Sequence, residues 1–429
     1  MSIQQAQLAN GLRVVTERMP DVRSVSFGVE VGTGSRDEAP GIAGASHFLE
    51  HLLFKGTEQR TGREISEAVD AAGGDMNACT ARESTMFYIR LLGEDAELGL
   101  DLLCDTVLHP TLAPADVEVE RQVILEEILQ HDDDPGDVVH ERWAEALFAD
   151  HPLGRDPLGS KDSVTRTTAG EVRQFFTEHY RPANMVVAAA GDLDHDRVVA
   201  AVEARFAGRE GGSAPGRTAP DGTQERLVVE EDDTEQVHLV VGVRGLACDD
   251  HDRHALAVLE HALGGGLSSR LWQQVREERG LAYSVYSFRS QYHGAGTLGV
   301  CAGTAPKHLE EVLGLVTAEL DSLAAGGITE RERQIAVGHL VGELALSLED
   351  SGSRMARIGR AVLVHGRVRT CDEVVASLRA VTLAEVAAVA ERVLSRPRTL
   401  ALVGPVDAAT LVGWSHSSTG TRDINERRK

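Results

Sequence analysis

The feature that most constrains the fold is an internal repeat, because the second half of the 429-residue chain faintly restates the first half. Three pairs of segments match in the same order: HFLEHLLFKG (47–56) with AVLEHALGGG (257–266), EVERQVILEEI (118–128) with TERERQIAVGHL (329–340), and TAGEVRQFFTEHYRP (168–182) with TLAEVAAVAERVLSRP (382–397). The offsets are 257 − 47 = 210, 332 − 120 = 212 and 382 − 168 = 214. An offset that drifts this slowly indicates duplication of one structural unit.

The segment between the copies, AGREGGSAPGRTAPDG (207–222), is rich in Gly, Pro, Ser and Ala and has no hydrophobic period. This composition predicts a flexible linker. We therefore divide the chain into an N-terminal catalytic domain (1–206), a linker (207–223) and a C-terminal homologous domain (224–429). Alternating strand patterns and helical patterns are mixed within each half. The predicted class is α+β, with two homologous α/β-sandwich halves, each a mostly antiparallel sheet with helices on one face.

Charge and cysteine usage narrow the class of protein. With 43 basic and 67 acidic residues, the formal net charge is −24, which argues against a nucleic-acid or anionic-membrane surface. No stretch approaches the roughly 20 apolar residues of a membrane-spanning helix, and the N-terminus lacks the pattern of a secretion signal. The five cysteines show no C-x-x-C spacing, which argues against a disulfide framework and a thiolate zinc site. We expect a cytoplasmic enzyme.

The strongest chemical signal is H-F-L-E-H, formed by His47, Glu50 and His51. Apolar residues around it have helical spacing, and positions four apart lie on one face of a helix, so both imidazoles can reach one ion. Glu50 is displaced around the helix axis, which suits a base acting on water better than a third ligand. The order H-x-x-E-H is a hydrolase signature, and a catalytic zinc needs a third protein ligand from elsewhere.

The helix expected at DVEVERQVILEEILQ offers Glu118, Glu120, Glu126 and Glu127 as that ligand. Glu120 and Glu127 are two helical turns apart and share a face, whereas Glu126 is turned away by roughly 100°. A carboxylate that faces inward from an apolar helix is costly unless it meets a cation. We predict Glu127 as the zinc ligand and Glu120 as the carboxylate that orients a ligand, with a plain ion-pair or solvent role as the alternative for Glu120.

These residues closely resemble the M16 family of zinc metallopeptidases, which includes pitrilysin, insulin-degrading enzyme and the mitochondrial processing peptidase. The likeness extends to NGLRVV, FKGT, NACTARESTMFYIR, HPLGRDPLGS, FFTEHYRPANMVVAAAGD, SSRLWQQVREERGLAYSV and ALSLEDSGSRMARIGR. It implies paired α+β halves that form a chamber, and at this length a dimer of two-domain chains. It also implies one zinc per chain, bound by His47, His51 and Glu127, with Glu50 as general base and Glu120 in support.

The resemblance assigns further residues to substrate. Arg276 and Tyr283 match the arginine and tyrosine that the family brings over the peptide and the developing oxyanion. The segment around Asn77, Ala78, Cys79 and Thr80 matches the edge strand to which substrate adds as an extra strand. Gly264, Gly265 and Gly266 match a glycine-rich loop of the family. As alternatives, Arg276 could be a surface charge and the glycines a helix-ending turn.

The predicted function is metal-assisted hydrolysis of peptides or unfolded polypeptide segments by a zinc metalloendopeptidase. Ala257 replaces the first histidine in the second copy and His339 stands where Glu127 would fall, so we expect that half to be metal-free. One alternative is the catalytic subunit of a heterodimeric processing peptidase, and another is a non-catalytic structural or chaperone-like member of the fold. We favour a homodimer with two active sites.

Overall fold

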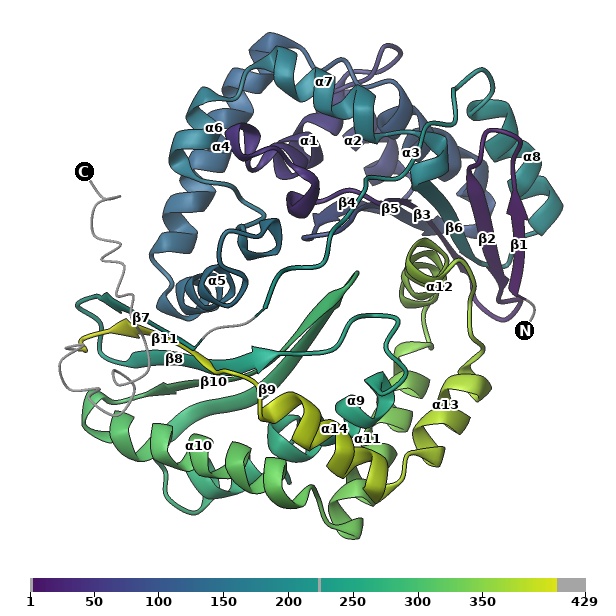
Figure 1. The fold of residues 1–429 in the computed structure, drawn as a ribbon. Coiled ribbons are helices and arrows are strands. Elements are labelled where there is room, and N and C mark those ends of the chain that lie inside the picture. The colour runs from purple at the N-terminus through teal and green to yellow at the C-terminus, as the bar shows by residue number, and fades with distance from the viewer. Residues whose placement is uncertain (1–2, 223–224, 407–429) are drawn as a thin grey trace. The chain divides into compact units, whose positions relative to one another are not determined.

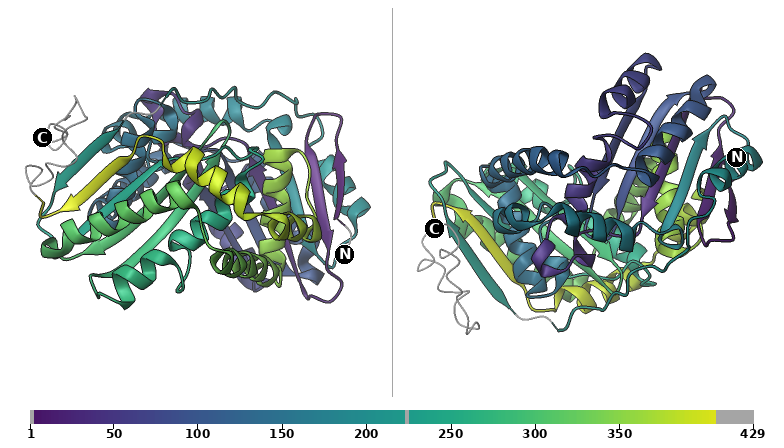
Figure 2. Two further views of the ribbon diagram at one scale, coloured as in Figure 1. Left: turned by 60° about the horizontal axis from the view of Figure 1, so that its bottom comes forward. Right: turned by 90° about the horizontal axis from the view of Figure 1, so that it is seen from above.

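The computed structural model describes residues 3–222 and 225–406, which form two compact units (Figure 1). The units are not contiguous in sequence. Among the described residues, the first unit comprises 3–129, 155–217 and 344–369, and the second comprises 130–154, 218–222, 225–343 and 370–406. Each unit therefore takes a segment from the other half of the chain, an exchange that the division at the linker did not predict. Figure 2 shows the layers of each unit from two further sides.

The first unit is built on a six-stranded sheet of order β1-β2-β6-β3-β5-β4, in which only the β2–β6 pair is parallel. Its strands are β1 (Ile3–Gln7), β2 (Arg13–Arg18), β3 (Ser24–Val31), β4 (Asp75–Thr80), β5 (Thr85–Leu92) and β6 (Met185–Gly191). Its helices are α1 (Ala45–Leu53), α2 (Gly62–Ala71), α3 (Ala96–Leu108), most of α4 (Pro114–Asp132), α6 (Lys161–Arg166), α7 (Ala169–His179), α8 (His195–Arg205) and α12 (Ser351–His365).

The sheet of the first unit is covered on both faces. Alternate residues of β3, such as Phe27 and Val29, pack with α1, α3 and α4 in the main core. The opposite face packs against α12 of the second half of the sequence, where Met355 and Ile358 lie against β6. Every residue of β6 is buried, as expected for a continuous apolar run between two layers. The predicted α+β class is confirmed. The helix α12 covers the face of the sheet that was expected to carry no helices.

Polar contacts fix α12 on this sheet. The buried Arg354 guanidinium forms an ion pair with Glu17 at 2.5 Å, and the Ser351 hydroxyl lies 2.9 Å from that of Ser26. The Arg13 guanidinium donates to the carbonyl of Val362 at 2.8 Å, near the other end of the helix. Contacts at both ends specify one position for α12, because a buried charge left without its partner would cost several kcal/mol.

Glu30 of β3 also lies under α12. Burial raises the pKa of its carboxyl from 4.5 to about 7, although the positive charge of Arg360 acts to lower it. The protonated form is therefore favoured in the folded state, so stability falls as the pH rises from 4.5 to 7. We expect Glu30→Gln to raise the free energy of unfolding at pH 8 by about 3 kcal/mol relative to wild type, with little gain at pH 5. Urea unfolding at both pH values measures this, and an equal effect at the two would contradict it.

The second unit repeats the plan with a five-stranded sheet of order β7-β11-β8-β10-β9, in which only the β7–β11 pair is parallel. Its strands are β7 (Arg226–Glu231), β8 (Val237–Arg244), β9 (Ala282–Tyr292), β10 (Ala295–Thr304) and β11 (Thr399–Gly404). Its helices are α5 (Pro135–Phe148), α9 (Arg253–Gly264), a π-helix (Trp272–Glu277), α10 (Leu309–Gly326), most of α11 (Glu330–Ser347), α13 (Cys371–Ala380) and α14 (Leu383–Leu394).

The helix α5 plays in the second unit the part that α12 plays in the first. Its Trp143 lies in a core with Val240 and Ala401, and the indole N–H donates to the Thr399 carbonyl at 3.0 Å. A side chain at Gly242 would meet the Trp143 ring at 2.7 Å, so glycine is needed where the indole approaches the sheet. The two halves of the sequence thus exchange one helix each.

The linker is anchored at Arg217. The segment 207–222 has no helix or strand, but the Arg217 guanidinium forms an ion pair with Asp37 at 2.6 Å and donates to the carbonyls of Gly32 and Glu83. These contacts hold the linker near Arg217 against the first unit.

No single helix in the described ranges is long and apolar enough to cross a membrane. The helical segments Pro306–Gly326 and Glu330–Ser347, bent by 104° against each other, pass that test only as a pair.

Candidate metal centre

The helix α1 carries H-F-L-E-H, and its position is set at its first turn. The buried carboxylate of Glu38 accepts hydrogen bonds from the backbone N–H groups of Gly44 and Ser46, each at 2.7 Å. A carboxylate at this end of a helix satisfies unpaired donors and complements the helix dipole. One face of the helix, with Phe48, Leu49, Leu52 and Leu53, is buried in the core. This packing leaves His47, Glu50 and His51 on the partly exposed face.

The ligand atoms predicted from the sequence converge. The Nε2 atoms of His47 and His51 lie 3.6 and 3.4 Å from Oε2 of Glu127, and one ligand atom from each residue falls within 4.8 Å of the others. Ligands about 2.0–2.2 Å from a tetrahedral zinc are roughly 3.3–3.6 Å apart. Glu127 Oε2 and His47 Nδ1 are buried and have no hydrogen-bond partner within the described ranges. An unsatisfied buried oxygen facing two imidazole nitrogens fits a metal ion.

Electrostatics at the cluster also suit a cation. Burial, with a contribution from His51, lowers the pKa of His47 to about 4, so its imidazole is neutral as a metal ligand must be. Burial raises the pKa of Glu127, and the charges of Glu50 and Glu120 add to that effect while His51 opposes it. The carboxylates of Glu50, Glu120 and Glu127 gather around the two imidazoles, an excess of acidic groups that a divalent ion would compensate.

Glu120 supports the cluster from a position two turns before Glu127 on α4. Its side chain is 3% exposed, and its Oε2 lies 2.9 Å from Nδ1 of His51. This contact directs the Nδ1 proton to Glu120 and leaves the Nε2 lone pair free for a metal. Its other oxygen forms an ion pair with Lys55. The face shared by Glu120 and Glu127 is confirmed, and Glu126 is exposed as expected.

Glu50 lies beside the edge strand β4. Burial raises the pKa of the Cys79 thiol on β4 and of the Tyr180 hydroxyl, and the charge of Glu50 makes the second largest contribution in the same direction. Among the described strands, β4 pairs with β5 only, with Asn77 opposite Tyr88, so its other edge offers backbone groups for a further strand. The Ala78 side chain enters the core, whereas Cys79 is exposed. The predicted substrate strand is thus a free edge near the predicted base.

Comparison with known proteins gives the family. The insulinase (peptidase family M16) profile matches residues 13–161, and that of the peptidase M16 inactive domain matches residues 166–338. A relative from Streptomyces coelicolor, described as an uncharacterized zinc protease, is 45% identical over 422 residues, covering 94% of this chain and 90% of the relative. One from Bacillus subtilis with the same description is 39% identical over 397 residues, covering 92% and 97%. The chain belongs to the M16 family of zinc proteases. These relatives support zinc as the cofactor.

Two solved structures share the fold. A structure from Pseudomonas fluorescens, described as a peptidase M16 inactive domain, has a TM-score of 0.88 at 21% identity and covers 95% of this chain and 99% of its own. A protease from Helicobacter pylori has a TM-score of 0.87 at 23% identity, covering 94% and 99%. At these identities the likeness shows the fold alone, and it extends over both halves of the duplicated chain.

The second half of this M16 chain places different side chains at the duplicated positions. Ala257 is buried, and the His261 ring stacks on that of His339 at 4.2 Å between centroids. α9 ends at Gly264, and side chains at Gly265 and Gly266 would meet the His261 ring at 2.8 and 2.9 Å. The three predicted loop glycines therefore end a helix and make room for an imidazole. Their role toward substrate stays a prediction.

Arg276 and Tyr283 lie together in the second unit. The Arg276 guanidinium carbon is 5.0 Å from the centroid of the Tyr283 ring, which is 79% exposed. It also lies 4.0 Å from the centroid of Trp272, a residue the sequence did not single out. Arg276 is therefore in contact with two aromatic rings, and its role toward the peptide stays a prediction.

Sequence reasoning missed Lys55 and Tyr180 as well. Lys55 follows His51 by four residues, a spacing that could have placed it near Glu120. Tyr180 is 5% exposed and packs between Phe87 and Phe176, so only the fold brings it near Glu50.

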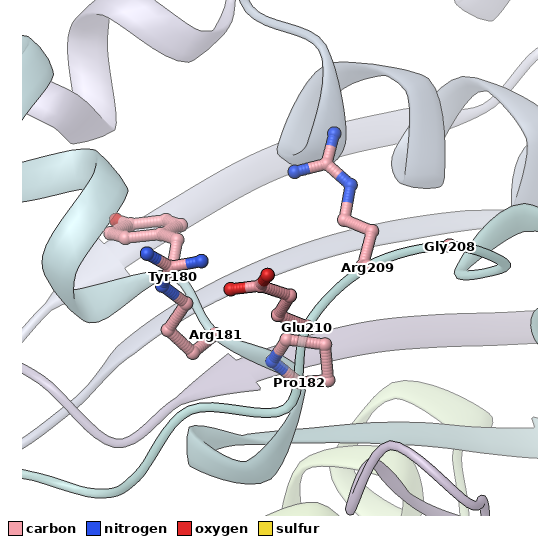
Figure 3. Close-up of a pocket in the computed structure, with 6 residues that line it drawn as sticks. All are labelled: Tyr180, Arg181, Pro182, Gly208, Arg209 and Glu210. Carbon is pink, nitrogen blue, oxygen red and sulfur yellow. The ribbon is translucent and has the colours of Figure 1, made fainter.

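A cavity of about 370 Å³ in the first unit is distinct from the metal cluster. It is lined by Tyr180, Arg181, Pro182, Gly208, Arg209 and Glu210 (Figure 3). In this view the Arg181 and Arg209 guanidinium groups lie well separated on either side of the Glu210 carboxylate, and that of Arg209 donates to the Leu108 carbonyl. The arginines do not converge on one point in the cavity.

Proposed function

We propose that this protein is a zinc-dependent endopeptidase that hydrolyses peptides or unfolded polypeptide segments, with one zinc per chain. The observation that carries the proposal is the convergence of two imidazole Nε2 atoms and an unsatisfied buried carboxylate oxygen, from His47, His51 and Glu127, with Glu50 beside them. A zinc ion held by these three residues would supply Lewis-acid chemistry, which polarises a carbonyl and makes a water acidic.

Glu50 would carry the proton. Its carboxylate accepts a proton from the attacking water and then delivers it to the departing amine, so the same group acts first as base and then as acid. Its place one residue before His51 keeps it next to the ligand face without joining the ligand set. The neighbouring carboxylates of Glu120 and Glu127 support this division of roles, because Glu120 is engaged by His51 and Lys55 and Glu127 faces both imidazoles.

The substrate would bind as an additional strand on β4. Backbone hydrogen bonds from the free edge recognise any extended peptide, and side-chain pockets then set preference. Asn77, Cys79 and Thr80 would line this edge. In the second unit, the Tyr283 hydroxyl would donate to the developing oxyanion and Arg276 would bind the peptide. Both roles rest on the family resemblance and on the contact between these side chains.

The test combines metal analysis with cleavage. We expect the purified chain to carry about one zinc per chain and to cut a peptide library at internal bonds, and we expect a chelator to abolish cleavage and added zinc to restore it. Absence of stoichiometric zinc, or an uncut library with the zinc-loaded protein, would overturn the proposal.

For the assembly we propose a homodimer with two active sites. One chain holds both the zinc ligands and the arginine–tyrosine pair, so the site residues of the first and second halves are all present without a degenerate partner chain. A catalytic subunit that needs such a partner is the alternative. Cleavage by the isolated chain separates the two.

A further inference from the structure

The Arg276 guanidinium lies against two aromatic rings. Its central carbon is 4.0 Å from the centroid of Trp272 and 5.0 Å from that of Tyr283. Trp272 and Arg276 lie four residues apart in a π-helix, Trp272–Glu277, and residues at that spacing are neighbours on the surface of a helix. π-helical turns are rare and occur often at functional sites. The backbone itself therefore places the indole over the guanidinium.

The charge of Arg276 is not neutralised by its acidic neighbours. Glu277 accepts a hydrogen bond from the Trp272 indole N–H at 3.2 Å, and Glu278 pairs with Arg279 at 3.4 Å. Within the described ranges, Arg276 makes no ion pair or hydrogen bond through its guanidinium. Aromatic faces hold a guanidinium without using its N–H groups. These donors therefore stay available to a ligand, even though the chain as a whole is strongly acidic.

We propose that Trp272 is a positioning residue, which holds Arg276 and through it Tyr283 in the arrangement that receives the peptide. This inference rests on the proposed function. A free arginine side chain samples many rotamers, and the entropy of that freedom would be lost when the substrate binds. Stacking on Trp272 removes much of that loss beforehand, so the indole strengthens substrate binding without touching the substrate.

The test compares two replacements of the indole. We expect Trp272→Leu, which keeps an apolar side chain but no aromatic face, to raise KM about fivefold with kcat within about twofold of wild type. Trp272→Phe keeps a ring face and should restore most of the loss. In an Arg276→Ala background, Trp272→Leu should add almost nothing, because the two residues act through one contact.

Other results would overturn the inference. A lower kcat with an unchanged KM in Trp272→Leu would show only that less of the enzyme is correctly folded, and would contradict the inference. An equal effect in the Arg276→Ala background would show that Trp272 does not act through Arg276.

One readout is independent of catalysis. The Nε–H proton of Arg276, shielded by the two rings, should move downfield in spectra of ¹⁵N-arginine-labelled Trp272→Leu protein but not of Trp272→Phe protein. If wild type cuts no peptide, the proposed function fails, and this shift still decides whether Trp272 holds Arg276. An unmoved resonance in Trp272→Leu contradicts the inference.

Discussion

Glu50→Gln should abolish peptide cleavage while the zinc site stays loaded. The amide cannot accept the proton of the attacking water, so we expect kcat to fall by about 10³-fold, within the range of a lost general base. Zinc content should stay near wild type, because Glu50 stands next to the ligand set without belonging to it. Peptide turnover and metal analysis on one preparation measure both quantities, and the affinity for an uncut peptide should be nearly unchanged.

The duplicated chain supplies a matched control for this variant. Glu260 occupies the position of Glu50 in the second copy, next to His261, and its carboxylate accepts from the Ser287 hydroxyl at 2.8 Å. Glu260→Gln makes the same chemical change in that half, and we expect it to retain cleavage. Turnover by Glu50→Gln at the wild-type rate, or equal losses in both variants, would remove Glu50 from the chemistry.

Much of the metal centre could be predicted because it depends on helix periodicity. The spacing of four between His47 and His51 and of seven between Glu120 and Glu127 fixes which side chains share a face, whatever the helices pack against. The start of a helix depends on local pattern in the same way. Thr382 caps α14 and pairs with Glu385 as its sequence pattern predicts.

The exchange of helices between the halves was not predictable from those patterns. An amphipathic helix reveals which of its faces is apolar, but its sequence does not say which sheet that face will cover. The signal lay instead in the strands. β6 is apolar at every position and β11 at every position after Thr399, and both strands are fully buried, a pattern of strands covered on both faces. Only the fold then shows that α12 and α5 provide those second layers.

The contacts of Trp272 escaped prediction for a similar reason. Trp272 and Arg276 are four residues apart, so their contact needs only a helical turn. The π-helical form of that turn, and the approach of the Tyr283 ring of β9 to the same guanidinium, depend on the fold and not on periodicity.

Replacing the carboxylate ligand should remove the metal. We expect Glu127→Gln to weaken zinc binding by more than about a hundredfold, because a neutral amide oxygen replaces a charged ligand that faces both histidines. Cleavage should be lost with the metal. The zinc-dependent rise in unfolding temperature, which follows from binding to the folded state alone, should disappear at the same zinc concentration. Titration with a zinc-buffered indicator and thermal unfolding with and without zinc measure the effect.

The stability of the metal-free proteins separates a role of Glu127 in metal binding from a role in folding. Burial and the charges of Glu50 and Glu120 raise the pKa of Glu127, so the carboxylate is under repulsion when no cation is present. Metal-free Glu127→Gln should therefore be at least as stable as metal-free wild type, although it is less stable in zinc. Glu126→Gln makes the same change at the neighbouring, exposed position and should bind zinc as wild type does. A metal-free Glu127→Gln protein that is clearly destabilised, or one that retains wild-type zinc affinity, would mean that Glu127 serves the fold rather than the metal.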